Sequence, residues 1–528
     1  MILKITDWLH RLRSESKSVA ATFSTIYGPD DSLHREKLNL LHQSLQAFGE
    51  ALGFDRPVFL LRAPARVNLM GVHVDHQGGY TNYVVVDRDL FTVVSPQEDD
   101  RVVVRNYDGQ RYRGREFSIS QEIPPRQRGD WLSFIEKYPI TPGDWVNYIK
   151  AGSLVLQDQF ADRSLRGMKL LIHGDIPPSA GLSSSAALVL LTAMAIQRVN
   201  GLDIPPQEMI ELCGQGEWFV GTRAGAGDHA AMVFGKRGQV MHTRFFPLQV
   251  DFSPLPAGYR MVICQSYREA SKSAGAKDIF NERIASYRIG VLLIKKFFPQ
   301  LAVKVERIGD LNLRNLSLTE LAIFQLLQKL PNCITRQEIR KLLPDREEEL
   351  KSVFQSHREP REGYRVREVC LFGVAECHRS ARFKEVLRKG DLADIGEMMF
   401  ISHDGDRRWK FASDGSKVPW YNDYSDESFE RLVRQMAGRE EFLHTLPGGY
   451  RCSCEELDEL VDLARSVEGV VGASLTGGGL GGCMVILVKE ANAQRLLEVL
   501  SKNFYEKHWL PVGCRVHESV NGAGPIDF

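Results

Sequence analysis

The stretch PPSAGLSSSAA, residues 177–187, follows a strand stop and opens a long apolar segment that ends at Asn200. The apolar run 168–172 before it is typical of a buried strand, and 183–200 is typical of a buried helix closed by Gly201. Glycine and serine let a backbone approach an anion closely, and the first turn of a helix offers unpaired N–H groups. The stretch therefore predicts a phosphate-binding loop without the lysine of a P-loop, although a serine cap on a buried helix explains it equally well.

A second stretch, residues 477–482, holds five glycines in six positions and comes directly before the apolar run 483–488. So many glycines carry an entropic cost that a plain turn would not require. Close packing of this backbone against a ligand or another loop is one interpretation. A flexible hairpin is the other.

A third stretch, residues 62–79, follows the predicted strand 58–61 and mixes arginine, histidine, aspartate and glycine. A metal site fits it poorly, because no HExxH spacing occurs. A polar sugar pocket fits better, since aspartate and histidine can hydrogen-bond to vicinal hydroxyls; a solvated loop is the plain alternative. Farther along, Asp228 lies among glycines at the expected start of a helix, eleven residues after Glu217. A lone cap aspartate is the plainer interpretation of that position.

Composition and charge argue against several classes of protein. The 528 residues include 67 basic and 67 acidic side chains, so the net charge gives no support to nucleic-acid or membrane-surface binding. The nine cysteines are scattered without a CxxC pair, which favours reduced, mostly buried thiols over a disulfide scaffold. No segment approaches the roughly 20 apolar residues that span a bilayer, and we expect a soluble, cytoplasmic protein.

Outside these motifs, the chain shows three further regions. Residues 1–56 carry leucines and aromatic residues at helical spacing and predict a helical extension. The charged, leucine-spaced region 300–365 predicts surface helices, and the polar region 405–450 predicts an irregular, lid-like insertion. Tyr83–Val86 and Leu90–Val94 are expected to form two separate strands.

Taken together and in this order, the motifs resemble those of the GHMP kinases, and within them the galactokinase branch. The first family motif corresponds to APARVNLMGVHVDHQGG at 63–79, the second to PPSAGLSSSAA and the third to LTGGGLGGC at 475–483. The resemblance implies a two-domain α+β GHMP kinase fold. Its N-terminal half, at 57–250, would be like domain 2 of ribosomal protein S5, and its C-terminal half, at 251–528, would be ferredoxin-like. It assigns no role to the extension or to the insertions near 300–365 and 405–450.

The resemblance also implies roles for individual residues. Asp228 matches the catalytic aspartate, which would take or orient the proton of the sugar hydroxyl, and Arg66 matches the arginine that would hold it ionised. ATP and Mg²⁺ are the expected cofactors, with a small-molecule sugar and ATP as partners, no nucleic acid, no membrane, and a monomer or small homo-oligomer. The remaining matched positions are Pro178, Gly181, Leu182, Ser183, Ser184 and Ser185 for ATP, Ser185 and Glu217 for magnesium, and His73, Asp75, Gly78 and Gly478 for the sugar.

The implied reaction is phosphorylation of the anomeric hydroxyl of galactose or a galactose-like sugar. Val72 departs from the pattern, because galactokinases carry a glutamate there that contacts the C6 hydroxyl, and valine cannot accept that bond. The pattern VHVDHQGG also resembles plant galacturonokinases, in which case a cation such as Arg268 or Arg283 could pair with a uronate. A kinase for another sugar, such as arabinose or fucose, and a non-catalytic sugar and ATP sensor stay open as alternatives.

Overall fold

The computed structural model describes residues 1–13, 16–221, 225–269, 274–412 and 414–528. Its largest sheet has nine strands, in the order β1-β2-β3-β6-β4-β5, with β15 also on β2 and with β7 joining β3 to β8. All of its pairs are antiparallel except β4 with β6. The strands are β1 (Leu3–Lys4), β2 (Pro57–Met70), β3 (Tyr80–Pro96), β4 (Arg101–Asn106), β5 (Arg115–Ser118), β6 (Met168–Gly174), β7 (Gln239–Arg244), β8 (Gln249–Pro254) and β15 (Gly524–Ile526).

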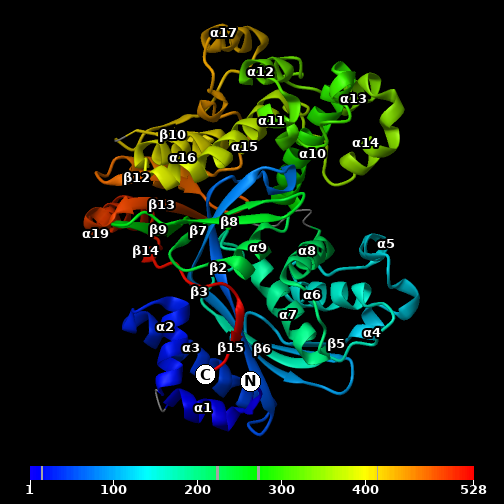
Figure 1. The fold of residues 1–528 in the computed structure, drawn as a ribbon, viewed down its shortest axis with the longest axis vertical. Helices are drawn as coiled ribbons and strands as arrows, with labels where there is room; N and C mark the ends of the chain where they lie inside the picture. The colour runs from blue at the N-terminus through cyan, green and yellow to red at the C-terminus, as the bar shows by residue number, and fades with distance from the viewer. Residues whose placement is uncertain (14–15, 222–224, 270–273, 413) are drawn as a thin grey trace.

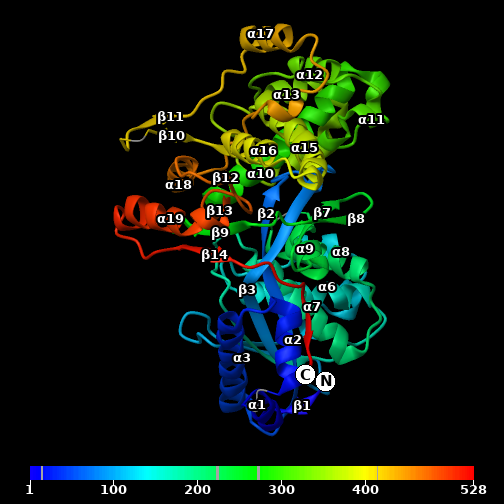
Figure 2. The ribbon, with the colours of Figure 1, turned by 60° about the vertical axis from the view of Figure 1, so that its left-hand side comes forward.

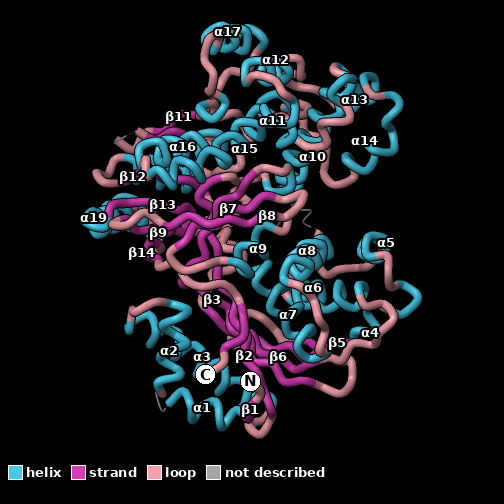
Figure 3. Tube along the Cα trace, in the orientation of Figure 1, coloured by secondary structure: helices cyan, strands magenta, loops and turns pink. Residues whose placement is uncertain are grey.

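Strands β2 and β3 are longer than the sequence predicts, and they run through the middle of the molecule (Figures 1 and 3). Strand β2 continues past Pro64, where the register shifts so that Pro64 pairs with Asp89 and Ala65 pairs with Val86. This irregularity accommodates a proline that cannot donate a ladder hydrogen bond. The expected separate strands Tyr83–Val86 and Leu90–Val94 are wrong, because the polar residues between them stay inside one strand. Asp89 is fully buried there and pairs with Arg62, Nε to Oδ1 2.6 Å.

Three helices form the extension before β2 and pack on one face of the large sheet, in the lower part of Figure 1: α1 (Ile5–Arg13), α2 (Lys17–Tyr27) and α3 (Asp31–Leu52). Trp8, Phe23 and Phe48 are at most 1% exposed and join a cluster with sheet residues. The buried Lys37 pairs with Asp89 at 3.2 Å and Asp175 at 2.8 Å, which ties α3 to the sheet. The predicted helical extension is therefore present.

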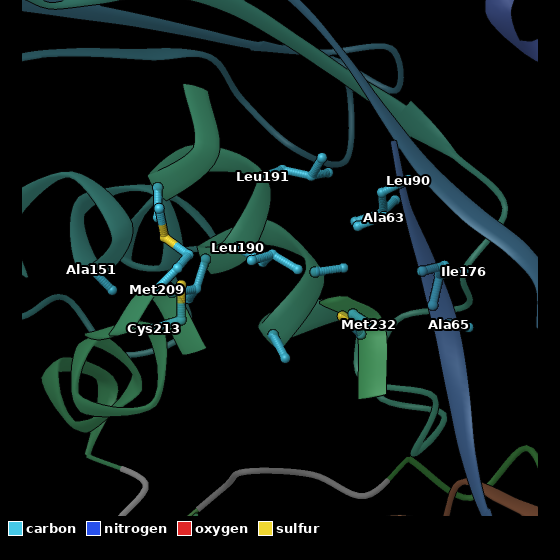
Figure 4. Close-up of a cluster of buried hydrophobic side chains, with 14 of the residues drawn as sticks. Ala63, Ala65, Leu90, Ala151, Ile176, Leu190, Leu191, Met209, Cys213 and Met232 are labelled. Atoms are coloured by element: carbon cyan, nitrogen blue, oxygen red, sulfur yellow. The ribbon is translucent and has the colours of Figure 1, made fainter. Parts of the chain in front are cut away.

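The other face of the sheet is covered by α6 (Val146–Gln159), α7 (Ser184–Asn200) and α8 (Pro206–Glu217). Figure 4 shows where side chains from these helices meet the strand: Leu190 and Leu191 of α7 approach Ala63 and Ala65 of β2. Helix α7 is apolar nearly all round and ends at Gly201, whose φ of 57° closes the helix in the left-handed conformation. The predicted buried helix is confirmed to within one residue.

A four-stranded antiparallel sheet in the order β12-β13-β9-β14 lies beside the large sheet. Helices α16, α18 and α19 pack against it. Its elements are β9 (Tyr259–Gln265), β12 (Val470–Leu475), β13 (Cys483–Lys489), β14 (Cys514–His517), α16 (Leu392–Asp406), α18 (Glu455–Arg465) and α19 (Glu490–Leu500).

The two inserted regions gather at the top of Figure 1 around α10 (Ala274–Phe297) and α15 (Val366–Lys389). Region 300–365 forms short helices, as expected, but they are more than a surface layer, because Phe324, Ile339 and Leu350 are fully buried. Region 405–450 is more regular than expected. It contains the hairpin of β10 (Trp409–Phe411) and β11 (Lys417–Pro419), followed by α17 (Asp426–Met436).

After β14 the chain returns to the large sheet, where β15 pairs with β2 (Figure 2). The predicted boundary at 250/251 therefore cuts through β8, and both β8 and β15 belong to the first sheet. The division into 57–250 and 251–528 remains a prediction. Within the described ranges, no helix combines the length and the apolar character that crossing a bilayer requires.

Candidate active site

Arg66 and Asp228 form a two-point ion pair between β2 and the start of α9 (Gly227–Phe234). Arg66 donates from Nε to Oδ1 at 2.6 Å and from Nη2 to Oδ2 at 2.7 Å. Its third nitrogen, Nη1, donates to the carbonyl oxygen of Gly181 at 2.7 Å. One guanidinium thus joins residues that lie far apart in the sequence, and this geometry is the strongest kind of arginine–carboxylate contact.

The electrostatic setting keeps the carboxylate of Asp228 ionised. Burial alone would raise its pKa, but the charge and hydrogen bonds of Arg66 and the hydroxyl of Ser183 outweigh burial, so the pKa lies below its ordinary value. Ser183 Oγ donates directly to Asp228 Oδ2. At neutral pH this carboxylate can accept a proton or orient a hydroxyl.

The loop before α7 has the backbone of an anion-binding nest. Ser179, Gly181 and Ser183 have φ values of 57°, 73° and 64°, so left-handed residues alternate with others, and α7 starts at Ser184. Ser183 holds the cap position, but its side chain makes no capping hydrogen bond, because the hydroxyl donates to Asp228 instead. The plain serine-cap interpretation is therefore wrong. Among the other positions predicted for ATP, Leu182 is buried beneath the loop, while Pro178, Ser184 and Ser185 are exposed or partly exposed.

The glycine-rich stretch 477–482 packs directly on this nest. A Cβ at Gly477 would lie 2.6 Å from the carbonyl oxygen of Gly181, and one at Gly482 would lie 2.8 Å from the backbone of Ala180. Thr476 Oγ1 accepts a hydrogen bond from the backbone of Asn68 in β2 at 2.8 Å. Of the two interpretations offered by the sequence, close packing against another loop is the one observed.

The predicted sugar residues fall into two groups. Asp75 lies beside the start of α9, since a Cβ at Gly225 would come within 2.4 Å of its Oδ2. His73 lies instead against the C-terminal part of the chain, where its ring stacks on Tyr450 with centroids 4.1 Å apart. Its Nε2 is 3.3 Å from Asp406 Oδ2.

A Cβ added at either glycine predicted for the sugar would make only ordinary van der Waals contacts. Gly478 is exposed, and the side chain nearest to an added Cβ there would be Phe280, at 3.9 Å. Gly78 has a φ of 78°, and a Cβ added there would lie 3.9 Å from the Arg307 side chain of the inserted region. Neither has a described contact with Asp228.

Glu217, the last residue of α8, is 8% exposed, and its carboxylate has no hydrogen bond or ion pair to any described residue. Burial lowers the pKa of His229, the neighbour of Asp228, and the nearby charge of Glu217 opposes this shift. Ser185 is partly exposed in the first turn of α7, which packs against α8. A buried carboxylate without a partner among the described residues fits a cation ligand, although the same residues contain no cluster of three or more His, Cys, Asp or Glu side chains that could hold a metal.

Two residues near the site have no place in the sequence prediction. The ring of Tyr83 lies 5.8 Å from the Arg66 guanidinium, and its pKa is raised well above its ordinary value by burial and by the charges of Asp75 and Asp228. Glu376 of α15 is fully buried and accepts hydrogen bonds from the backbones of Gly71 and Val72, at 2.8 and 3.2 Å.

The sequence gives only an indirect signal for Glu376. Glu376 and Arg379 lie three residues apart in the apolar run of α15, and they pair at 2.8 Å with neither side chain exposed. Opposite charges three residues apart predict a pair on one helix face, but this spacing does not predict the contacts of Glu376 with Gly71 and Val72.

Three family models match separate parts of the chain. The GHMP kinases N terminal domain matches residues 147–236, the GHMP kinases C terminal model matches 425–506, and the galactokinase galactose-binding signature matches 46–96. These ranges contain the Arg66, Ser183 and Asp228 positions and the glycine-rich stretch.

The chain is also similar to curated relatives along most of its length. It is 26% identical over 472 residues to a galactokinase of Dictyostelium discoideum, covering 88% of this chain and 87% of that protein. It is 28% identical over 434 residues to a galactokinase of Chloroflexus aggregans, covering 82% and 84%. The crystal structure of Lactococcus lactis galactokinase complexed with galactose superimposes with a TM-score of 0.65 at 21% identity, covering 91% of this chain and 98% of that one, which shows the shared fold.

Proposed function

Since this chain carries the N-terminal and C-terminal domains of the GHMP kinases and so belongs to that family, we propose that it transfers the γ-phosphoryl group of ATP to the anomeric hydroxyl of galactose or a galactose-like sugar. The observation that carries the proposal is the meeting of Arg66, Asp228 and Ser183 at the nest that precedes α7. The galactokinase names of the relatives support galactose as the first sugar to test.

In the proposed reaction, Asp228 accepts the proton of the anomeric hydroxyl while that oxygen attacks the γ-phosphorus of ATP. The bond from the γ-phosphorus to the bridging oxygen breaks, and ADP leaves with the electron pair. Arg66 keeps Asp228 ionised before the transfer, and its positive charge would also stabilise negative charge on the phosphoryl oxygens. The nest backbone and the first turn of α7, including Ser184, hold the phosphates.

Ser185 and Glu217 are the residues that would hold magnesium. The ion, when bound, supplies positive charge to the phosphate oxygens. Glu217 fits this role because its carboxylate is almost fully buried and is left without a partner by the described residues. Ser185 fits it because its hydroxyl lies in the same helical turn that would hold the phosphates.

The identity of the sugar rests on the region around His73 and Asp75. Val72 is 4% exposed and packed in the apolar core, so it offers no acceptor for a C6 hydroxyl. We therefore keep galacturonate as a second candidate substrate. Of the two cations considered for pairing with its carboxylate, Arg268 is 64% exposed, whereas Arg283 is largely buried and donates to the carbonyl oxygen of Tyr450 at 2.5 Å.

A sugar panel tests this proposal. Galactose, galacturonate, arabinose and fucose are supplied with ATP and magnesium, and sugar-dependent ADP release is measured for the wild type and for Asp228→Asn. We expect turnover with galactose or galacturonate and a loss of at least about 10³-fold in Asp228→Asn. Asp203→Asn, at an exposed position with no described partner, is the matched control. Binding of ATP and sugar without ADP release would favour a non-catalytic sensor, and equal rates for Asp228→Asn and the wild type would refute the assigned base.

A further inference from the structure

Four arginines line one pocket of about 280 Å³ in the C-terminal half: Arg283, Arg365, Arg408 and Arg451, with Ile279 as the remaining lining residue. They come from α10, from the residue before α15, from the turn after α16 and from the loop before α18. Three of them lie within or next to the two inserted regions. A concave site lined almost entirely by arginines differs from a flat solvated surface, where arginines spread apart.

The positive charge in this pocket is only partly compensated. Arg283 pairs with Glu282, and Arg365 pairs with Glu362 at 2.7 Å and Glu368 at 3.8 Å. By contrast, no carboxylate of the described residues lies within 4 Å of the guanidinium of Arg408 or of Arg451. Among the described residues, the side chain of Arg451 contacts the carbonyl oxygen of Trp420, at 3.4 Å, and the face of Tyr421.

Two further features disfavour positive charge at individual positions in this pocket. Burial lowers the pKa of Arg451. The charge of Glu368 raises it, and the charges of Arg365, Arg283 and Arg408 lower it further. Arg365 occupies the N-terminal cap position of the 24-residue helix α15, where the helix dipole disfavours a cation. An anion in the pocket would relieve both.

We propose that this arginine pocket binds a small molecule that carries phosphate or carboxylate groups, at a site separate from the nest that precedes α7. The planar guanidinium forks match the oxygen pairs of either group. The volume suits a ligand of a few to about a dozen non-hydrogen atoms. The proposal gives the two inserted regions a role, because they supply or flank three of the four arginines.

The pocket lies next to the candidate sugar region. Arg283 Nε donates to the carbonyl oxygen of Tyr450, and the ring of Tyr450 stacks on His73. Phe280, on the same helix as Arg283, has its ring 6.5 Å from that of His73. The anion can therefore be either an acidic group on the sugar itself or a separate small anion beside the sugar, and binding experiments can distinguish these two sources.

The test is a calorimetric titration of the full chain with a non-hydrolysable ATP analogue present, so that the nest is already filled. The three probes are pyrophosphate, galacturonate and galactose, the last being the neutral match of galacturonate. The variants are Arg408→Gln and Arg451→Gln. Neither substitution removes an ion pair found among the described residues, so both variants should fold. Arg434→Gln, at an exposed position on α17, is the control.

We expect at least one of the two anionic probes to bind the wild type, and each pocket variant to weaken it roughly ten-fold, because a charge-assisted hydrogen bond is lost. Arginine-dependent binding of galacturonate alone identifies the sugar's own carboxylate as the ligand. Arginine-dependent binding of pyrophosphate identifies a separate anion. Unchanged affinity in both variants, or no binding of either anion, overturns the proposal. These titrations need no turnover, so their failure leaves the proposed kinase reaction to be judged by ADP release.

Discussion

Replacing Arg66 by glutamine tests the ion pair on which the site depends. The change removes two charge-assisted hydrogen bonds to Asp228, of 2.6 and 2.7 Å, and one to Gly181. Each such bond contributes about 1.5–3 kcal/mol, but the Asp228 side chain is 27% exposed and water recovers part of that loss. Electrostatic groups aimed at a transition state typically contribute about 3–4 kcal/mol, so we expect kcat/KM to fall roughly 10²–10³-fold.

The same variant has a pH signature. In the folded wild type the pKa of Asp228 is lower than in the unfolded chain. Its ionised form therefore stabilises the folded state at pH values above the unfolded-state pKa, and this stabilisation is lost as the pH falls through the folded-state pKa. Without Arg66, burial becomes the dominant influence, and the pKa of Asp228 rises. We therefore expect the acid limb of kcat/KM to move to higher pH, and the difference in thermal midpoint between wild type and variant to widen as the pH increases from 4 to 7.

Both quantities can be measured with coupled ADP detection and calorimetric unfolding over that pH range. Arg382→Gln is a suitable control, because Arg382 also contacts one aspartate, Asp394, through two nitrogens, at 3.1 and 2.9 Å, but lies on α15 away from the nest. If Arg66→Gln stayed within ten-fold of the wild type with an unmoved acid limb, the assignment of Arg66 and Asp228 as a functional pair would be refuted.

Three further predictions concern the surroundings of the site. Gly477→Ala should raise the KM for ATP more than about ten-fold, because the added Cβ would lie 2.6 Å from the Gly181 carbonyl oxygen. Gly438→Ala is the control, since Gly438 has a similarly positive φ but open space around it, and an equal effect on KM there would contradict the packing argument. Glu376→Gln should lower the free energy of unfolding by about 3–5 kcal/mol in denaturant titrations, because the buried Arg379 loses its partner; a change below about 1 kcal/mol would mean that the pair is not a structural anchor. For Asp87, burial raises the pKa, but the hydrogen bond from His517 and nearby charges lower it to about 2. Asp87→Asn should therefore be less stable than the wild type by about 1–2 kcal/mol at pH 7, and this difference should shrink below pH 4, whereas a pH-independent difference in unfolding experiments would rule out the ionised carboxylate as its cause.

Several elements of the fold could be predicted from local sequence patterns. The apolar helix after the nest, the strand before it and the helical extension all follow from periodicity within one segment, because each buries a face that its own residues specify. The strands β2 and β3 were underestimated for the opposite reason. Pro64 and Asp89 look like breakers in sequence, but they face each other at a register shift, and Asp89 is paired with Arg62.

The candidate site was partly accessible from the sequence. Asp228, Arg66 and Ser183 do meet. Two of them lie in motifs whose order resembles a known family, and Asp228 matches a position of the same family. The contribution of Glu376 and the arginine pocket could not be predicted, because they depend on how α15 and the inserted regions fold back over the first motif. Such long-range contacts leave no periodic signal in a single sequence.

The pairing of β15 with β2 has a consequence for biosynthesis. Gly524 aligns with Arg62, and Arg62 also donates to the carbonyl oxygens of Asn521 and Gly522, contacts that bridge some 460 residues of chain. While a ribosome is still making the segment between them, that edge of β2 has no neighbour at these positions and its amide groups stay available to other polypeptides. The emerging chain is therefore exposed to misassembly for most of translation, and chaperone shielding of this edge should increase the yield of active protein.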